Sequence, residues 1–270
     1  MIIDFHTHAF PDKIAQRTIK LLYEEANGEY IPVSDGTISG LIKNMDDWGI
    51  NISIIQPIVT RQPQTKSINE WAAEINNNYP GRIISFGSIF PHSDDYKGDI
   101  DFVAGLGLKG LKFHAEYQDF ILDDEKMLKI YDYALSKNLI ILHHAGFDPA
   151  FPEPFKSNPE RFSHVIKEMR GGIIIAAHLG GHAQWDDVEK YICGTNIYLD
   201  TSMGFEYFTQ EQFLRILKNH GSDKILFGSD APWSNAKTET EHIKNLPLTE
   251  ISESEINAIL SANAKRILNI

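Results

Sequence analysis

Cysteine is almost absent from this chain of 270 residues, which contains a single one, Cys193. One cysteine cannot form a disulfide within the chain and cannot build a thiolate-rich metal site, so any bound metal would depend on nitrogen and oxygen ligands. Long apolar runs are lacking too, since no stretch approaches the roughly 20 residues that a membrane-spanning helix needs. The start, MIIDFHTH, does not resemble a secretion signal. We therefore expect a cytoplasmic protein that does not bind membranes.

Positive charge is scarce as well. The chain has 25 lysines and arginines against 37 aspartates and glutamates, a net charge of −12. This charge repels phosphate backbones and no local run of basic residues offsets it, so we do not expect nucleic-acid binding. No G-x-G-x-x-G or other glycine-rich phosphate loop follows the first apolar run, which argues against a nucleotide-binding open sheet.

Short apolar and β-branched runs are present, and they alternate with segments of helical periodicity. Eight such runs, too apolar for a solvated face, are typical of an α/β fold of the (β/α)8 TIM-barrel type. We expect one domain over residues 1–270, because a barrel of this kind needs about 250 residues. The expected strands are Ile2–Phe5, Ile52–Ile58, Arg82–Ile89, Lys109–Phe113, Leu139–Leu142, Ile173–Ala177, Ile197–Leu199 and Lys224–Phe227.

Helices are expected between these strands and after the last one. Asp123 and Thr209 stand where N-caps belong, while the pair Gly171 and Gly172, and also Gly221, follow helical segments as stops. The expected helices are Asp12–Ala26, Ile38–Trp48, Ile68–Tyr79, Ile100–Leu106, Asp123–Lys137, Pro159–Met169, Trp185–Ile192, Glu211–Asn219 and Glu253–Leu268.

Histidines and aspartates gather at the carboxyl ends of the expected strands, where a parallel barrel forms its active site. His6 and His8 are separated by one residue, so on an extended strand both rings can reach one metal ion. Asp230 ends the run ILFGSD and can ligate a metal or accept a proton, although an isolated aspartate more often caps a turn.

Two adjacent histidines, His143 and His144, follow the fifth strand and must point to opposite sides of it. Both parities of Leu139–Leu142 are apolar, so periodicity leaves open which ring faces the barrel mouth. The other ring is expected to be a buried, hydrogen-bonded packing residue. His178 follows five apolar residues of the sixth strand and precedes a glycine pair, a position that suits proton transfer first and a further metal ligand as the alternative.

Three further side chains are candidates for contact with substrate or for support of the metal ligands. Lys112 and His114 share a parity near the end of the fourth strand, where a solvated lysine is the ordinary alternative. Asp200 ends the seventh strand and could orient a ligand, bind substrate or cap a turn.

Together these motifs resemble the amidohydrolase superfamily, and within it the branch that includes aminocarboxymuconate-semialdehyde decarboxylase. The resemblance spans nearly the whole chain. It lies in D-x-H-x-H at Asp4, His6 and His8, GLKGLKFH at residues 107–114, H-A-G from His144, A-H-L-G-G around His178, G-S-D-x-P from Gly228 to Pro232, and SANAKRIL at residues 261–268.

The resemblance implies one divalent metal ion, with zinc the first choice, held by His6, His8, His144 and Asp230. It favours His144 over His143, because the family histidine precedes a small residue and a glycine. His143 then becomes a residue that supports the ligands. Family members with two metals use a carboxylated lysine on the fourth strand, near the position of Lys112. One metal is expected because the branch resembled usually has one.

The function implied first is hydrolysis of an amide, ester or lactone bond of a small molecule by metal-activated water, with Asp230 as base and His178 stabilising the oxyanion or protonating the leaving group. The alternative from the same branch is non-oxidative decarboxylation of an aromatic or unsaturated carboxylic acid. A third hypothesis is a barrel that binds metal and ligand without turnover. The sequence leaves the oligomeric state open, and a homodimer is expected only from the frequency of dimers.

Overall fold

The computed structural model describes residues 1–169 and 171–270. Within these residues, eight parallel strands follow one another around a barrel and form one sheet of three strands and one of five. They are β1 (Ile3–Thr7), β2 (Ile52–Ile55), β3 (Ile83–Ser85), β4 (Gly110–Phe113), β5 (Ile140–His143), β6 (Ile174–Ala176), β7 (Tyr198–Asp200) and β8 (Ile225–Leu226). The expected (β/α)8 barrel is confirmed, and each expected strand run overlaps one observed strand, although β1, β5 and β7 end one or two residues later than expected.

Backbone hydrogen bonds close the barrel where the two sheets meet. Gly87 joins β3 to β4, since its N–H donates to Gly110 at 2.8 Å and its carbonyl accepts from Lys112 at 2.9 Å. On the other side, the Phe5 N–H donates to the Phe227 carbonyl at 2.7 Å. Closure leaves no open sheet edge and brings the two ends of the strand series together.

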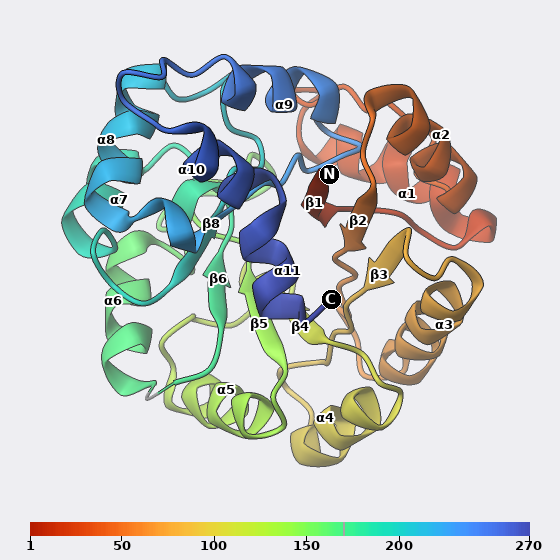
Figure 1. Cartoon of the computed structure of the whole chain (residues 1–270). Helices are drawn as coiled ribbons and strands as arrows, with labels where there is room; N and C mark the ends of the chain where they lie inside the picture. The colour runs from red at the N-terminus through yellow and green to blue at the C-terminus, as the bar shows by residue number, and fades with distance from the viewer. Residues whose placement is uncertain (170) are drawn as a thin grey trace.

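Helices surround the strands, as Figure 1 shows. Their apolar faces pack on the outer faces of the strands in the larger of two hydrophobic clusters. The helices are α1 (Asp12–Glu25), α2 (Ile38–Trp48), α3 (Gln64–Asn78), α4 (Tyr96–Gly105), α5 (Glu125–Ser136), α6 (Pro159–Glu168), α7 (Trp185–Tyr191), α8 (Gln210–His220), α9 (Ala236–Lys244), α10 (Glu253–Asn257) and α11 (Asn263–Leu268). No helix of the described residues is long and apolar enough to cross a membrane.

Helix starts and stops agree in part with the sequence. Thr209 is the expected N-cap and accepts from the Gln212 N–H. The expectation for Asp123 was wrong, because the N-cap is Asp124 and the helix begins at Glu125, whereas Asp123 pairs with Arg161 and His164. The expected last helix is interrupted by a π-helical turn at Ala258–Ala262, between α10 and α11.

Helix α9 was not expected, and its buried face explains why. That face consists of Ala236, Glu239, Thr240 and Ile243, so two of its four positions are polar. Hydrophobic periodicity therefore does not reveal the helix. The Glu239 side chain is 1% exposed and accepts from the Phe205 N–H at 3.3 Å. Burial raises the pKa of Glu239 to about 7.

Glu239 makes stability depend on pH in a predictable direction. Because its folded-state pKa lies above the unfolded value, the folded protein keeps a proton that the unfolded chain loses as the pH rises from about 4.5 to about 7. Stability is lost across this window. We expect the free energy of unfolding of Glu239→Gln, relative to wild type, to rise by about 3 kcal/mol between pH 4.5 and pH 8. Urea unfolding of both metal-free proteins measures this, and parallel pH curves would contradict it.

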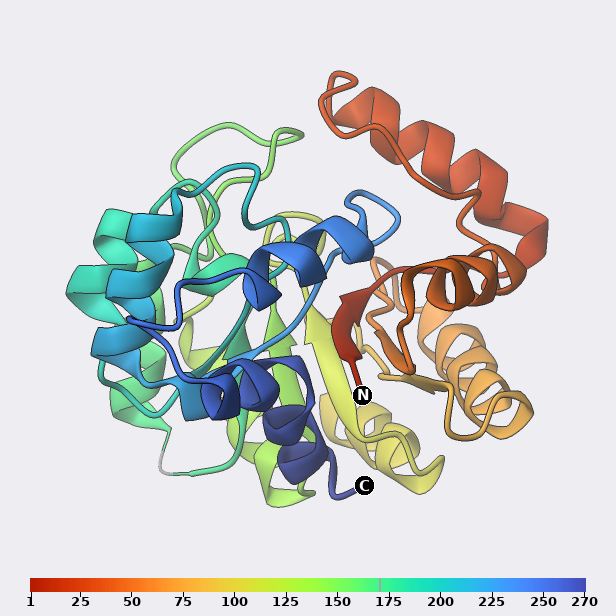
Figure 2. The same ribbon diagram turned by 45° about the horizontal axis from the view of Figure 1, so that its top comes forward.

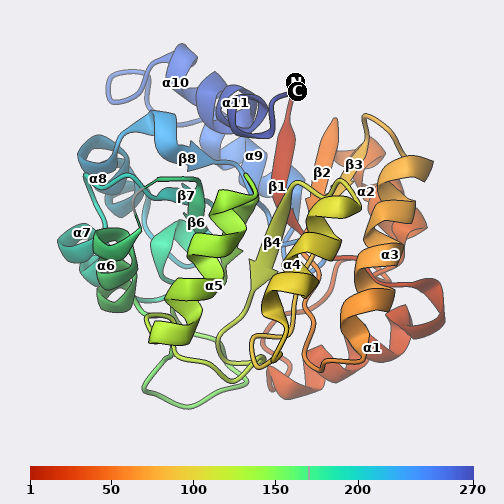
Figure 3. The same ribbon diagram turned by 90° about the horizontal axis from the view of Figure 1, so that it is seen from below.

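The two ends of the barrel differ in what covers them. Figure 3 shows α11 at the end where the strands begin, and α1 at the opposite end, where they finish. Ala264 and Leu268 of α11 belong to the inner cluster, together with Ile3, Phe5 and Phe86. The closing helix thus seals the amino-terminal end of the barrel and leaves the carboxyl end for a site.

Truncation of the buried α11 residue tests this seal. Leu268 is 1% exposed, so Leu268→Ala leaves a cavity at the bottom of the barrel and is expected to lower the free energy of unfolding by about 3 kcal/mol. Ile270→Ala is the matched control, because Ile270 is 53% exposed and its truncation should change stability by less than about 0.5 kcal/mol. Chemical denaturation of the three proteins makes the comparison, and equal losses would mean that α11 does not seal the barrel.

Candidate metal centre

A cavity of about 460 Å³ lies at the carboxyl ends of the strands. Its inner wall is polar and consists of His6, His8, Lys112, His114, His144, His178, His182 and Asp230. Its outer wall is mostly apolar and comes largely from α1, α3 and the segment after β2. The cavity therefore joins a group of side chains that could bind a metal to an apolar chamber, which is typical of a small-molecule site.

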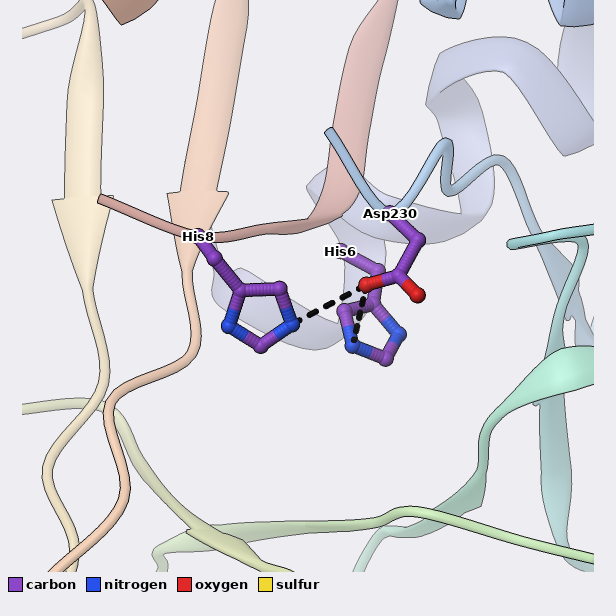
Figure 4. Close-up of side chains that lie close together, drawn as sticks. All are labelled: His6, His8 and Asp230. Carbon is purple, nitrogen blue, oxygen red and sulfur yellow. Dashed lines mark ion pairs between the residues drawn. The ribbon is translucent and has the colours of Figure 1, made fainter. Parts of the chain in front are cut away.

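His6, His8 and Asp230 form a close polar group in the cavity, and Figure 4 shows both rings turned toward one carboxylate oxygen. The Oδ1 atom of Asp230 lies 3.0 Å from Nε2 of His8 and 3.4 Å from Nε2 of His6. This oxygen is buried and accepts no hydrogen bond from any described residue. Burial raises the pKa of Asp230, but the facing imidazoles of His6 and His8 lower it by a larger amount. The net pKa is below the ordinary value, so the carboxylate stays ionised.

A local irregularity in β1 aims the two histidines. Ile3 and Phe5 belong to the inner cluster, so regular alternation would turn His6 and His8 away from the interior. The register with β2, however, shifts between Asp4 and Thr7. A bulge of this kind re-aims side chains, and it turns both rings into the cavity.

Asp4 ties β1 to the segment that carries Asp230. Its carboxylate accepts from the Ser229 N–H at 2.9 Å and from the Ser229 hydroxyl at 2.6 Å. The neighbouring Gly228 must lack a side chain, because a Cβ there would lie 2.9 Å from the Cβ of His6. These contacts place His6 and Asp230 on adjoining pieces of backbone.

Asp200 fixes the orientation of His6. Its Oδ2 lies 2.9 Å from Nδ1 of His6, which leaves Nε2 facing Asp230. The same Nε2 lies 3.1 Å from Nζ of Lys112. Lys112 is 1% exposed, and burial lowers its pKa to about 8. Asp200 and Lys112 were candidates from the sequence, and both contact the ring of His6.

The donor set fits a divalent cation. It offers two imidazole nitrogens and a carboxylate oxygen that converge within 4.8 Å of one another, and the oxygen lacks any other partner among the described residues. Nitrogen and oxygen donors of this kind suit zinc, manganese and similar ions. His6, His8 and Asp230 can therefore hold a metal, as expected from the sequence.

His144 and His178 adjoin this group without joining it. Nδ1 of His144 lies 3.0 Å from Nε2 of His178, whose Nδ1 lies 2.9 Å from the Ser202 hydroxyl. Nε2 of His144 is buried and has no hydrogen-bond partner among the described residues, so this nitrogen is free to bind a ligand. Burial lowers the pKa of His178 to about 3, which keeps the ring neutral. The assignment of His144 as a metal ligand stays a prediction.

The adjacent His143 points the other way. Ile140 and Leu142 face the barrel interior and His144 continues their parity, whereas His143 shares the outward parity of Ile141. The His143 ring stacks on Phe113 at 5.3 Å, and neither of its nitrogens has a hydrogen-bond partner in the described part of the chain. His143 is thus a packing residue between barrel and helices, without the expected hydrogen bond, and it does not line the cavity.

A second set of possible ligands, His114, His144 and Asp148, is also close enough to hold an ion. The two rings, however, are stacked at 4.0 Å with only 11° between their planes. Imidazole binds metal within its ring plane, and two parallel planes have no common point for an ion. Nε2 of His114 instead lies 3.2 Å from Asp148. His114 therefore lines the cavity, and its contact with substrate stays a prediction.

Four cavity or ligand-supporting residues escaped the sequence analysis: Tyr30, Asp148, His182 and Ser202. The tyrosine hydroxyl lies 3.2 Å from Nε2 of His182, which joins the loop after α1 to the loop after β6. The position of His182 after a glycine pair was a usable signal. Tyr30 and Asp148 lie in loops. No local sequence pattern predicts that these loops reach the cavity.

A metal-binding group at the carboxyl end of a (β/α)8 barrel defines a class of metal-dependent enzymes. The amidohydrolase family model matches residues 3–270, so the chain belongs to the amidohydrolase family. The family that the motifs resemble is therefore confirmed.

Solved structures of low sequence identity share the fold. The 5-carboxyvanillate decarboxylase of Sphingomonas paucimobilis is 15% identical with a TM-score of 0.71, covering 100% of this chain and 99% of its own. That of Novosphingobium aromaticivorans, with bound manganese, is 13% identical with a TM-score of 0.72, covering 100% and 97%. A probable 2-pyrone-4,6-dicarboxylic acid hydrolase of Acinetobacter baumannii is 16% identical with a TM-score of 0.67, covering 100% and 99%. No curated protein matches the chain significantly in sequence.

The contact between Asp200 and His6 leads to a prediction for metal affinity. Asp200→Asn removes the charge that orients His6, so affinity for zinc or manganese should fall about 10- to 100-fold. Asp148→Asn is the matched control, because Asp148 lies beside the stacked pair and should leave the affinity within about twofold of wild type. Competition with a chromophoric chelator measures both constants. Equal losses in the two variants would contradict the assignment of the metal to His6, His8 and Asp230.

Proposed function

We propose that this protein is a metal-dependent, non-oxidative decarboxylase of a small aromatic or unsaturated carboxylic acid. The carrying observation is the buried amine of Lys112, whose hydrogen-bond partner among the described residues is Nε2 of His6. If that nitrogen binds a metal, Lys112 loses its acceptor. A carboxylate oxygen of the substrate restores the lost hydrogen bond, because an unpaired buried amine is costly.

The shape and lining of the cavity support an acid with an unsaturated body. Trp71, Tyr117 and Trp233 line it together with aliphatic side chains. Such walls favour a flat ring or a conjugated chain. Decarboxylases of aromatic acids with the same fold are consistent with this choice, although at 13–15% identity they support the fold alone.

His6, His8 and Asp230 would hold the ion, with His144 as the further ligand expected from the family. One divalent ion is proposed. Zinc suits the donor set, and manganese is present in a structure with the same fold. When bound, the metal supplies positive charge that stabilises negative charge developing on the substrate.

The chain's own residues then position the acid and move one proton. Lys112 orients the carboxylate that leaves as carbon dioxide, and a proton must replace it on the same carbon atom. His178 stands on the cavity wall with its Nδ1 held by Ser202, so its Nε2 faces the interior beside His144. We assign the proton transfer to this ring, as the sequence suggested: the neutral imidazole would take a proton from water and pass it to that carbon atom.

Hydrolysis of an amide, ester or lactone is the second candidate. The observation that favours it is Oδ1 of Asp230, an ionised carboxylate oxygen that faces His6 and His8, accepts no hydrogen bond among the described residues and is able to take a proton from water. The two reactions differ in product. Carbon dioxide is released only in decarboxylation, and oxygen from labelled water enters the product only in hydrolysis.

A substrate screen with one lysine variant tests the proposal. The metal-loaded protein should release carbon dioxide from at least one member of a panel of hydroxybenzoic and unsaturated dicarboxylic acids. Lys112→Met should lower kcat/KM for that acid about 10- to 100-fold, the effect of losing a hydrogen bond to a charged group. The control is Lys109→Met on an exposed residue just before β4, which should leave activity unchanged. Label from water in the product without carbon dioxide would replace the proposal with hydrolysis.

A further inference from the structure

Helix α1 carries an apolar face that the fold does not cover. Ile14 and Leu21 are 48% and 49% exposed, yet both line the cavity that contains the metal-binding group. Residues on the same face at helical spacing, Thr18 and Leu22, line it as well. Figure 2 shows α1 standing out from the body of the barrel. This face, here called the α1 wall, consists of Ile14, Thr18, Leu21 and Leu22.

The other faces of α1 are accounted for. Ala15 and Ile19 are the buried residues that pack the helix onto the protein. Lys13, Arg17 and Lys20 are exposed and form a charged solvent face. The helix therefore has a packed face, a charged face and an apolar face directed at the cavity, and only the apolar one lacks a partner among the described residues.

The opposite side of the chamber is apolar too. Ile68 and Trp71 of α3 line the same cavity, and both are only partly buried. Beyond them, Tyr117 donates a hydrogen bond to Glu25 at the end of α1, at 3.3 Å. The chamber thus has two apolar walls, a polar inner end at Lys112 and a polar outer boundary at Glu25. Between the apolar walls and Lys112 its polarity changes from apolar to polar, as it does along an amphiphilic acid.

We propose that the α1 wall binds the hydrocarbon part of the substrate, so that the substrate is an amphiphilic acid with its carboxyl end at Lys112 and an apolar tail along Ile14 and Leu21. The assignment of the carboxyl end rests on the proposed function. The wall itself is continuous with the catalytic cavity, which favours a substrate over a second copy of the chain as its occupant. The tail buries apolar surface that the empty site leaves in water.

Isothermal titration calorimetry with 4-n-alkylbenzoates tests the proposal on the metal-loaded protein without any turnover. Affinity should rise about threefold for each added methylene from benzoate to 4-butylbenzoate. In the double variant Ile14→Ser with Leu21→Ser, the increment should fall below about 1.5-fold, while benzoate binds as in wild type. Lys20→Ser lies on the charged face of the same helix and should keep the full increment.

The other outcomes separate the wall from the proposed function. An equal affinity along the series, or an increment that survives the double variant, overturns the α1 wall but leaves decarboxylation standing. Neutral 4-n-alkylphenols test the opposite case, in which the α1 wall binds the tail but Lys112 does not bind the acid group. If only these bind, with an increment that the double variant removes, the wall stands and the acid anchor at Lys112 is wrong. A wild-type dimer in sedimentation velocity that the double variant dissociates, with no change in the increment, would assign the face to self-association and overturn the proposal.

Discussion

The hydrogen bonds that join β1 to the segment after β8 hold the site together. The Asp230 N–H donates to the His6 carbonyl at 2.8 Å, and the His8 N–H donates to the Ala231 carbonyl at 2.6 Å. The Asp4 carboxylate joins the same two segments, because it accepts hydrogen bonds from the N–H and the hydroxyl of Ser229. These bonds close the barrel, and the same bonds set two imidazoles opposite a carboxylate. The metal-binding geometry therefore depends on barrel closure, and a loss of closure would scatter the ligands.

Burial of these charged side chains costs free energy, and the pairing of opposite charges offsets that cost. Asp200, Lys112 and Asp230 are nearly inaccessible to water. An isolated buried charge would shift its pKa until it became neutral. Around His6, in contrast, charges of opposite sign lie close together. Asp200 contacts one ring nitrogen, and Asp230 and Lys112 both contact the other. A divalent ion on Nε2 would add positive charge beside Lys112, which is the physical reason for proposing an anionic substrate.

The sequence predicts the barrel well because its strands are apolar on both faces, and each run is bounded by polar loops. It also predicts which side chains stand at the strand ends, as with His6, His8 and Asp230. It could not choose between His143 and His144, since both parities of β5 are apolar and only the closed barrel defines an inside. Simple alternation in β1 gave a plausible pair of ligands, but the shifted register that aims them is a tertiary feature.

Contacts between residues far apart in the chain could not be predicted from the sequence. Tyr30 meets His182 across 152 positions of the chain, and no local pattern marks that contact. Helix α9 was missed because Glu239 and Thr240 occupy its buried face. Both cases concern residues whose environment comes from distant elements. Local propensity and periodicity describe single elements, so they locate ligands on strands and fail for the loops that shape the chamber.

Anomalous diffraction locates a bound metal directly, and so it tests whether His6, His8 and Asp230 hold the ion. Crystals of protein purified without chelator or metal-affinity resin would be measured on both sides of the absorption edge of the metal found in them. We expect one peak per chain, about 2.0–2.3 Å from Nε2 of His6, Nε2 of His8 and a carboxylate oxygen of Asp230. A peak at His114 and Asp148 instead, or no peak after reconstitution with zinc or manganese, would contradict it.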